Sequence, residues 1–226
     1  MIAQHLLTAA AGAPLGYLIA SATRNLPARM LHACDADAHT HLGIDCKPSK
    51  PLPMLSPIER GGRRDHVIAL LASCCTAAVG LLDDQVTIVA GFVLVLALLA
   101  LAVIDIESML LPDFIVLPLL WAGLLLCAIQ APMSTADHVM AAAGAYLLLR
   151  LAPGVAEGDA KLAAAGGGWI GLQALPIVGL VAGAVCCIQL LLLWCKGADL
   201  RARHPFGPAL AIGIASVWLG LQLNLC

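Results

Sequence analysis

Long uncharged apolar runs recur along this chain and restrict its fold more than any other feature. Between Leu162 and Cys195, 34 consecutive residues carry no charge. A helix needs about 20 apolar residues to cross a bilayer core, so this run is too long for one span, and Pro176 marks a break between two. With 61% hydrophobic and 12% charged residues and a mean hydropathy of +0.94, the chain is not an ordinary soluble domain. The sequence predicts an all-α, polytopic integral membrane protein.

Eight apolar segments are predicted to be transmembrane helices. They cover residues 1–23, 66–82, 86–104, 114–130, 136–151, 160–174, 177–195 and 206–223. The first segment contains no Asp, Glu, Lys or Arg and therefore lacks the basic region of a cleaved signal peptide. We expect a retained first span with its N-terminus outside.

The distribution of charge supports eight spans. With this topology all 12 Lys and Arg residues fall on the inner side, in or beside the connections 24–65, 105–113, 150–160 and 196–205. Without the short sixth span, Lys196, Arg201 and Arg203 would move outside. The formal net charge of −2 argues against nucleic acid as a partner and leaves membrane lipid as the expected surroundings.

Two aspartates, Asp105 and Asp159, stand where apolar runs meet polar breaks, and the predicted topology puts both at the inner membrane boundary. Ionisable groups near membrane depth are costly and usually functional. Two facing carboxylates can share one proton, so that one activates water while the other polarises a peptide carbonyl. The alternative for each is a solvated or capping residue at a helix end. We interpret Asp113 as the N-cap of the following helix and Glu107 as a solvated loop acid.

Short motifs around these aspartates resemble those of the bacterial type IV prepilin peptidases. Residues 104–124 are similar to the first aspartate motif of that family, and residues 157–171 to its Gly-x-Gly-Asp-x-Lys-Leu motif. Residues 205–211 match a C-terminal Pro-Phe-Gly-Pro element, and residues 16–27 resemble the end of the first span. The resemblance covers nearly the whole chain in the correct order. One departure is Ala156, which stands where the family has the first Gly of its second motif.

The resemblance implies a membrane aspartic endopeptidase of the bacterial inner membrane. Such an enzyme cleaves the basic leader peptide of type IV prepilins or pseudopilins at the cytosolic face, in pilus assembly or type II secretion. Asp105 and Asp159 would be the catalytic pair, with Asp113 outside it. Residues 1–23 would form the first helix, 24–65 a cytosolic loop, and 66–226 the peptidase core.

The 24–65 loop is a degenerate form of the loop that holds two Cys-x-x-Cys pairs in many family members. Five residues here could still donate zinc ligands: Cys34, Cys46, His32, His39 and His41. Their spacing fits no familiar zinc template, so a solvated polar loop is the favoured interpretation. No structural disulfide is expected, because the other cysteines lie mostly in apolar spans and this loop faces a reducing compartment. Methylation of the new N-terminus with S-adenosylmethionine, a second activity in the family, stays open.

Two other functions compete with the peptidase. A catalytically impaired scaffold for pilus or secretion assembly is compatible with the altered loop and with Ala156. A proton-coupled transporter would also use membrane carboxylates, but it predicts acids near mid-membrane and a structural repeat, and no repeat is visible.

Overall fold

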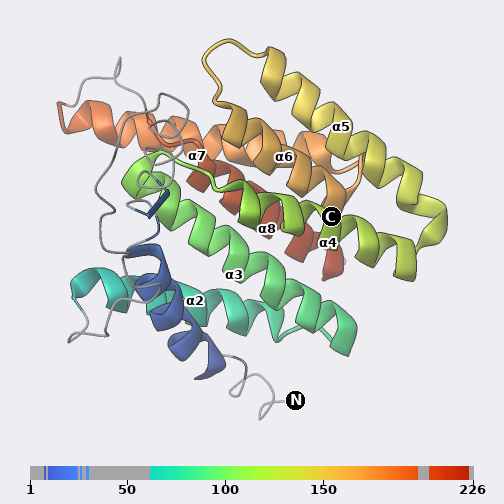
Figure 1. Cartoon of the computed structure of the whole chain (residues 1–226), viewed down its shortest axis with the longest axis horizontal. Helices are drawn as coiled ribbons and strands as arrows, with labels where there is room; N and C mark the ends of the chain where they lie inside the picture. The colour runs from blue at the N-terminus through green and yellow to red at the C-terminus, as the bar shows by residue number, and fades with distance from the viewer. Residues whose placement is uncertain are drawn as a thin grey trace, which may run out of the picture. The chain divides into compact units, whose positions relative to one another are not determined.

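Helices make up the regular structure in the residues that the computed structural model describes, which are 8, 10–24, 26, 29–30, 62–197 and 204–223 (Figure 1). After the helical residues 10–24 come α2 (Arg63–Val79), α3 (Gln85–Ser108), α4 (Asp113–Gln130), the 3₁₀ turn η1 (Pro132–Ser134), α5 (Thr135–Leu151), α6 (Glu157–Ile170), α7 (Leu175–Cys195) and α8 (Gly207–Gln222). The predicted all-α class is confirmed. Each predicted span has a helix in its place, and α3, α4 and α7 are long and apolar enough to cross a membrane.

The chain divides into two compact units, Met1–Ala77 and Ala78–Cys226. In the first unit the helix of residues 10–24 lies directly on α2. A Cβ atom on Gly16 would be 2.5 Å from the Cα of Ala69, so only glycine permits this approach. Glycine at a crossing point is how membrane helices come close enough to pack backbone against backbone.

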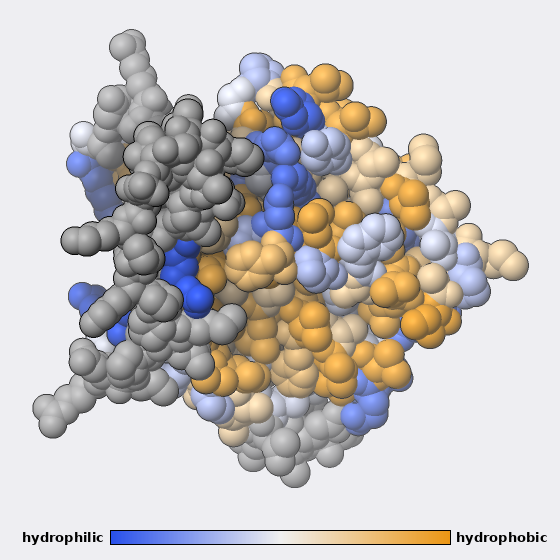
Figure 2. Space-filling model, viewed as in Figure 1, coloured by the Kyte–Doolittle hydropathy of each residue, from blue (hydrophilic) through white to orange (hydrophobic). Residues whose placement is uncertain are grey.

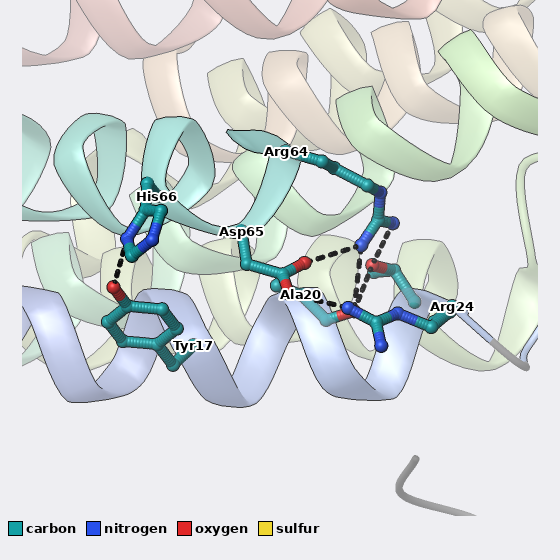
Figure 3. Close-up of polar contacts among 7 residues, drawn as sticks. Tyr17, Ala20, Arg24, Arg64, Asp65 and His66 are labelled. Atoms are coloured by element: carbon teal, nitrogen blue, oxygen red, sulfur yellow. Dashed lines mark hydrogen bonds and ion pairs between the residues drawn. The ribbon is translucent and has the colours of Figure 1, made fainter. Parts of the chain in front are cut away.

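A buried carboxylate joins these two helices (Figure 3). Asp65 is 4% exposed and accepts hydrogen bonds from Arg24 at 2.5 Å and from Arg64 at 3.3 Å. Nearby, the Tyr17 hydroxyl lies 2.6 Å from Nδ1 of His66. Burial acts to raise the pKa of Asp65, but the hydrogen bonds and charges of Arg24 and Arg64 outweigh it and hold the pKa below its usual value.

We expect Asp65→Asn to loosen the pairing of residues 10–24 with α2. Removing one partner of a buried charged hydrogen bond costs about 1–2 kcal/mol when the other partner stays partly solvated. Because the folded pKa is depressed, the wild-type contribution is present above the unfolded pKa of about 3.9 and is lost as the pH falls through the folded value. Amide hydrogen exchange in residues 10–24 checks the loosened pairing in the variant at neutral pH and the loss of the wild-type contribution as the pH falls. Equal protection in the variant and the wild type at neutral pH would contradict them.

In the second unit α6 is enclosed by its neighbours, and Figure 1 shows it beside α4, α5 and α8. Eleven of its 14 residues are buried. Gly167 would place a Cβ 2.6 Å from the backbone of Ala141 in α5, and Trp169 donates a 2.8 Å hydrogen bond to the Leu119 carbonyl in α4. The rings of Trp169 and Trp218 meet edge to face, which joins α6 to α8. These contacts fix α6 on three sides.

The ends of α3 are defined by local chemistry. Asp84 caps its start, because the side chain accepts from the Thr87 amide at 2.8 Å. Met109 ends the helix in the left-handed region, with φ of 54°, and its N–H donates to the Asp105 carbonyl. The chain therefore turns one helical turn after Asp105.

One expectation about a helix end was wrong. The N-cap of α4 is Pro112, and Asp113 is the first helical residue, whose carboxylate pairs with Lys161. The predicted break between two spans is confirmed: α6 ends at Gly171, with φ of 82°, and Pro176 lies in the first turn of α7. Gly171 can adopt a conformation that other residues avoid, and proline fits the first turn of a helix without losing a hydrogen bond.

Large apolar side chains remain exposed on these helices, and Figure 2 shows hydrophobic residues over much of the face that it presents. Leu180 is 74% exposed and Ile129 is 78% exposed. Soluble monomers rarely expose apolar surface on this scale. The exposed surface is that of a membrane protein, whose helices present apolar side chains to lipid.

Candidate functional site

Three helix ends meet around Asp105. The aspartate lies in the last turn of α3 and is 4% exposed. Its Oδ2 accepts a buried 2.9 Å hydrogen bond from the backbone N–H of Gly207, the first residue of α8. At the opposite end of α3, Gly91 lies against the ring of Trp218, so α3 and α8 run antiparallel. The start of α8 therefore faces the end of α3.

Asp159 is in the first turn of α6 and is 6% exposed. Burial, and then the nearby charge of Asp105, raise the pKa of Asp159 to about 6, while a hydrogen bond with the Ala156 backbone acts in the opposite direction. Its Oδ1 is buried and has no hydrogen-bond partner in the part of the chain that the structure describes. The two predicted site residues are thus close enough for one charge to act on the other.

Small residues let α6 reach this position. A Cβ on Gly158 would lie 2.9 Å from the Cβ of Leu111, in the connection between α3 and α4. Gly158 therefore serves close packing and not an unusual backbone angle. Ala156, the N-cap of α6, has φ of −73° and ψ of 151°, which alanine adopts without strain. The departure from glycine at this position needs no backbone adjustment.

A charged rim of three residues, Asp113, Glu157 and Lys161, includes the start of α6, which also carries Asp159. Lys161 lies 2.9 Å from Asp113 in α4 and 3.0 Å from Glu157 one turn earlier in α6. Both acids are more than half exposed. One lysine against two carboxylates leaves this rim with a net charge of −1. The sequence showed the lysine of the second motif, Lys161, but did not predict its contacts with Asp113 and Glu157.

The predicted zinc candidates Cys34, Cys46, His32, His39 and His41 lie outside the described residues. Within the described ranges there is no group of three or more residues that could hold a metal ion. The six cysteines of the described part are free: Cys74, Cys75, Cys127, Cys186, Cys187 and Cys195.

Comparison with known proteins identifies the family. Residues 92–192, which include both aspartates, match the model of the type IV leader peptidase family. A prepilin leader peptidase/N-methyltransferase of Burkholderia pseudomallei strain 1026b is 34% identical over 224 residues, covering 89% of this chain and 72% of the relative. The chain belongs to the type IV leader peptidase family. The resemblance predicted from its motifs is confirmed.

Two further relatives agree with this membership of the type IV leader peptidase family. A protein of the same description from Pseudomonas aeruginosa is 32% identical, over 78% of this chain and 69% of the relative. Another, from Aeromonas hydrophila, is 39% identical over 69% of this chain and 58% of the relative. No solved structure matches the chain. Gly207 lies outside the residues matched by the family model, and the sequence of its Pro-Phe-Gly-Pro element indicated no role for it.

Proposed function

We propose that this type IV leader peptidase is a membrane aspartic endopeptidase that removes the basic leader from type IV prepilins or prepilin-like pseudopilins. Asp105 and Asp159 are its catalytic pair, and cleavage takes place at the cytosolic face of the bacterial inner membrane. The observation that carries the proposal is the buried pair itself, in which the charge of one carboxylate acts on the other. Two such groups favour sharing one proton over both being ionised, as aspartic peptide hydrolysis requires.

The substrate is expected to lie in the bilayer beside the enzyme. Its apolar helix would be positioned by lipid and by the exposed apolar faces of the helices, and its leader would extend toward the helix ends that carry the pair. Residues 66–226 would form the peptidase core, and 24–65 the cytosolic loop. Membrane lipid is part of the expected surroundings, and nucleic acid is not an expected partner.

The acidic rim formed by Asp113, Glu157 and Lys161 would attract a basic leader. Glu157→Gln is expected to raise KM by about two- to fivefold at low salt, with kcat unchanged, because a single exposed charge contributes about 0.2–1 kcal/mol. Salt should shrink this difference, since exposed charges are screened. Steady-state cleavage of a prepilin at two ionic strengths measures this change in KM. Asp83→Asn is the matched exposed control. A salt-independent change in kcat would contradict the role.

Methylation of the new N-terminus is a separate question. The relatives' descriptions include N-methyltransferase, which favours S-adenosylmethionine as a second substrate. The loop that the family resemblance connects with that activity, residues 24–65, lacks both Cys-x-x-Cys pairs. The peptidase requires no cofactor in this scheme.

Two alternatives receive less support. A scaffold without catalytic activity would have no need of two buried carboxylates that interact. A proton-coupled transporter would need the acids on a path through the membrane, whereas Asp105 and Asp159 stand at helix ends.

Co-expression of the protein with a prepilin, followed by intact-mass measurement of the pilin, tests the proposed function. Loss of the leader mass is the expected result. An additional methyl mass would establish the second activity. An uncut prepilin in the presence of correctly inserted enzyme would favour the scaffold.

A further inference from the structure

Asp105 and Asp159 have different surroundings, and the difference assigns them different roles. We propose that Asp105 is the ionised member of the pair and acts as the base, that Asp159 holds the shared proton, and that the backbone amide of Gly207 fixes this division. The inference rests on the proposed peptidase function and deepens it. Gly207 is a positioning residue, because it contacts Asp105 and not the substrate.

The start of α8 favours a negative charge on Asp105. Gly207 is the first residue of the helix, so its N–H has no carbonyl partner within α8 and is free to donate outward. It donates to Oδ2 of Asp105 at 2.9 Å in a buried setting. The positive end of the helix dipole adds to this preference. Burial raises the pKa of Asp105, and the hydrogen bond from the Gly207 amide acts against this by stabilising the charged form.

Asp159 has the surroundings of a protonated acid. Its Oδ1 is buried without a hydrogen-bond partner among the described residues, and its other carboxyl contact is with the Ala156 backbone. An ionised oxygen left unpaired in a buried site would be costly. A protonated Oδ1 carries a donor that can point to a substrate carbonyl. The unpaired atom is therefore best explained as the one that carries the proton.

The resulting reaction is balanced. The Asp105 carboxylate takes a proton from water as the water oxygen bonds to the scissile carbonyl carbon, and Asp159 donates its proton to the carbonyl oxygen. The tetrahedral intermediate then breaks its C–N bond. The proton on Asp105 passes to the leaving nitrogen, and a hydroxyl proton of the intermediate returns to Asp159. One water and one peptide bond give one carboxylic acid and one amine.

Gly207→Ala tests the positioning role. The added Cβ would lie 2.7 Å from Oδ2, 3.0 Å from Cγ and 3.2 Å from Cβ of Asp105, so rotating the carboxyl group does not remove the collision. We expect kcat to fall by about 10²-fold while KM changes by less than about threefold, because the contact acts on the chemical step and not on binding. The control is Gly179→Ala, since a Cβ there meets nothing within 4 Å. A folded Gly207→Ala enzyme with wild-type kcat would overturn the role of the amide.

Infrared difference spectroscopy tests the assignment of the proton without relying on Gly207→Ala folding. At about pH 5, below the pKa of about 6 for Asp159, the wild type should show the C=O stretch of a buried protonated carboxyl. The band should disappear in Asp159→Asn and persist in Asp105→Asn. Any other pattern overturns the assignment. Failure of the proposed function is a separate result, which is retained cleavage in the asparagine variants.

Discussion

Asp105→Asn and Asp159→Asn are each expected to abolish leader cleavage while the protein still inserts into the membrane. Asparagine keeps the size of the side chain but can neither accept the proton from water nor share one with its partner. General acid–base catalysis by a single group contributes about 10²–10⁴-fold, and loss of one member disables the other, so the activity should fall by about 10³-fold or more. The measurement is the rate of prepilin cleavage in membranes, with the amount of inserted enzyme determined in parallel.

The same substitution at Asp83 is the matched control for this result. Asp83 is exposed in the turn between α2 and α3, at the opposite end of α3 from Asp105. Asp83→Asn should cleave at the wild-type rate. Cleavage retained by either Asp105→Asn or Asp159→Asn would remove the pair from the mechanism and return the scaffold to consideration.

Gly167→Ala is expected to have the largest effect on the stability of the second unit. The new Cβ would lie 2.6 Å from the carbonyl carbon and 2.7 Å from the oxygen of Ala141, and these are backbone atoms that cannot rotate away. Relief requires α5 and α6 to separate, at a cost of about 1–3 kcal/mol. In a chain of this size, each kcal/mol lowers Tm by about 2–4 °C. Cleavage should fall as well, because α6 carries Asp159.

Gly179→Ala separates this packing effect from the general consequence of adding a methyl group to a membrane helix. A Cβ on Gly179 meets no atom within 4 Å, so its Tm should stay within a few degrees of the wild type or rise, because alanine favours helix. Thermal unfolding of the purified protein in detergent compares the two. Equal Tm values for Gly167→Ala and the wild type would show that the contact between α5 and α6 is not as close as described.

The second motif illustrates which features the sequence pattern could predict and which contacts it could not. Gly158 directly precedes Asp159 and approaches Leu111, in the connection between α3 and α4. Gly158 leaves space for packing within a helix, and its φ is not positive. The N-cap predicted for Asp113 was wrong by one residue, because Pro112 holds that position. A lysine 48 residues later, Lys161, pairs with this carboxylate, and a contact so distant in the sequence has no local signature.

By itself the sequence determined the helical class, the positions of the apolar segments and the family, and it indicated the two aspartates as the candidate pair. Each of these follows from local information: run lengths that match a bilayer, the placement of charge, and short motifs. Tertiary structure alone decided that the amide of Gly207 donates to Asp105, 102 residues away. It also decided that Oδ1 of Asp159 is left without a partner among the described residues. Such differences depend on which helix ends meet in space. Two aspartates of the same chemical type therefore become distinguishable only after the helices have packed.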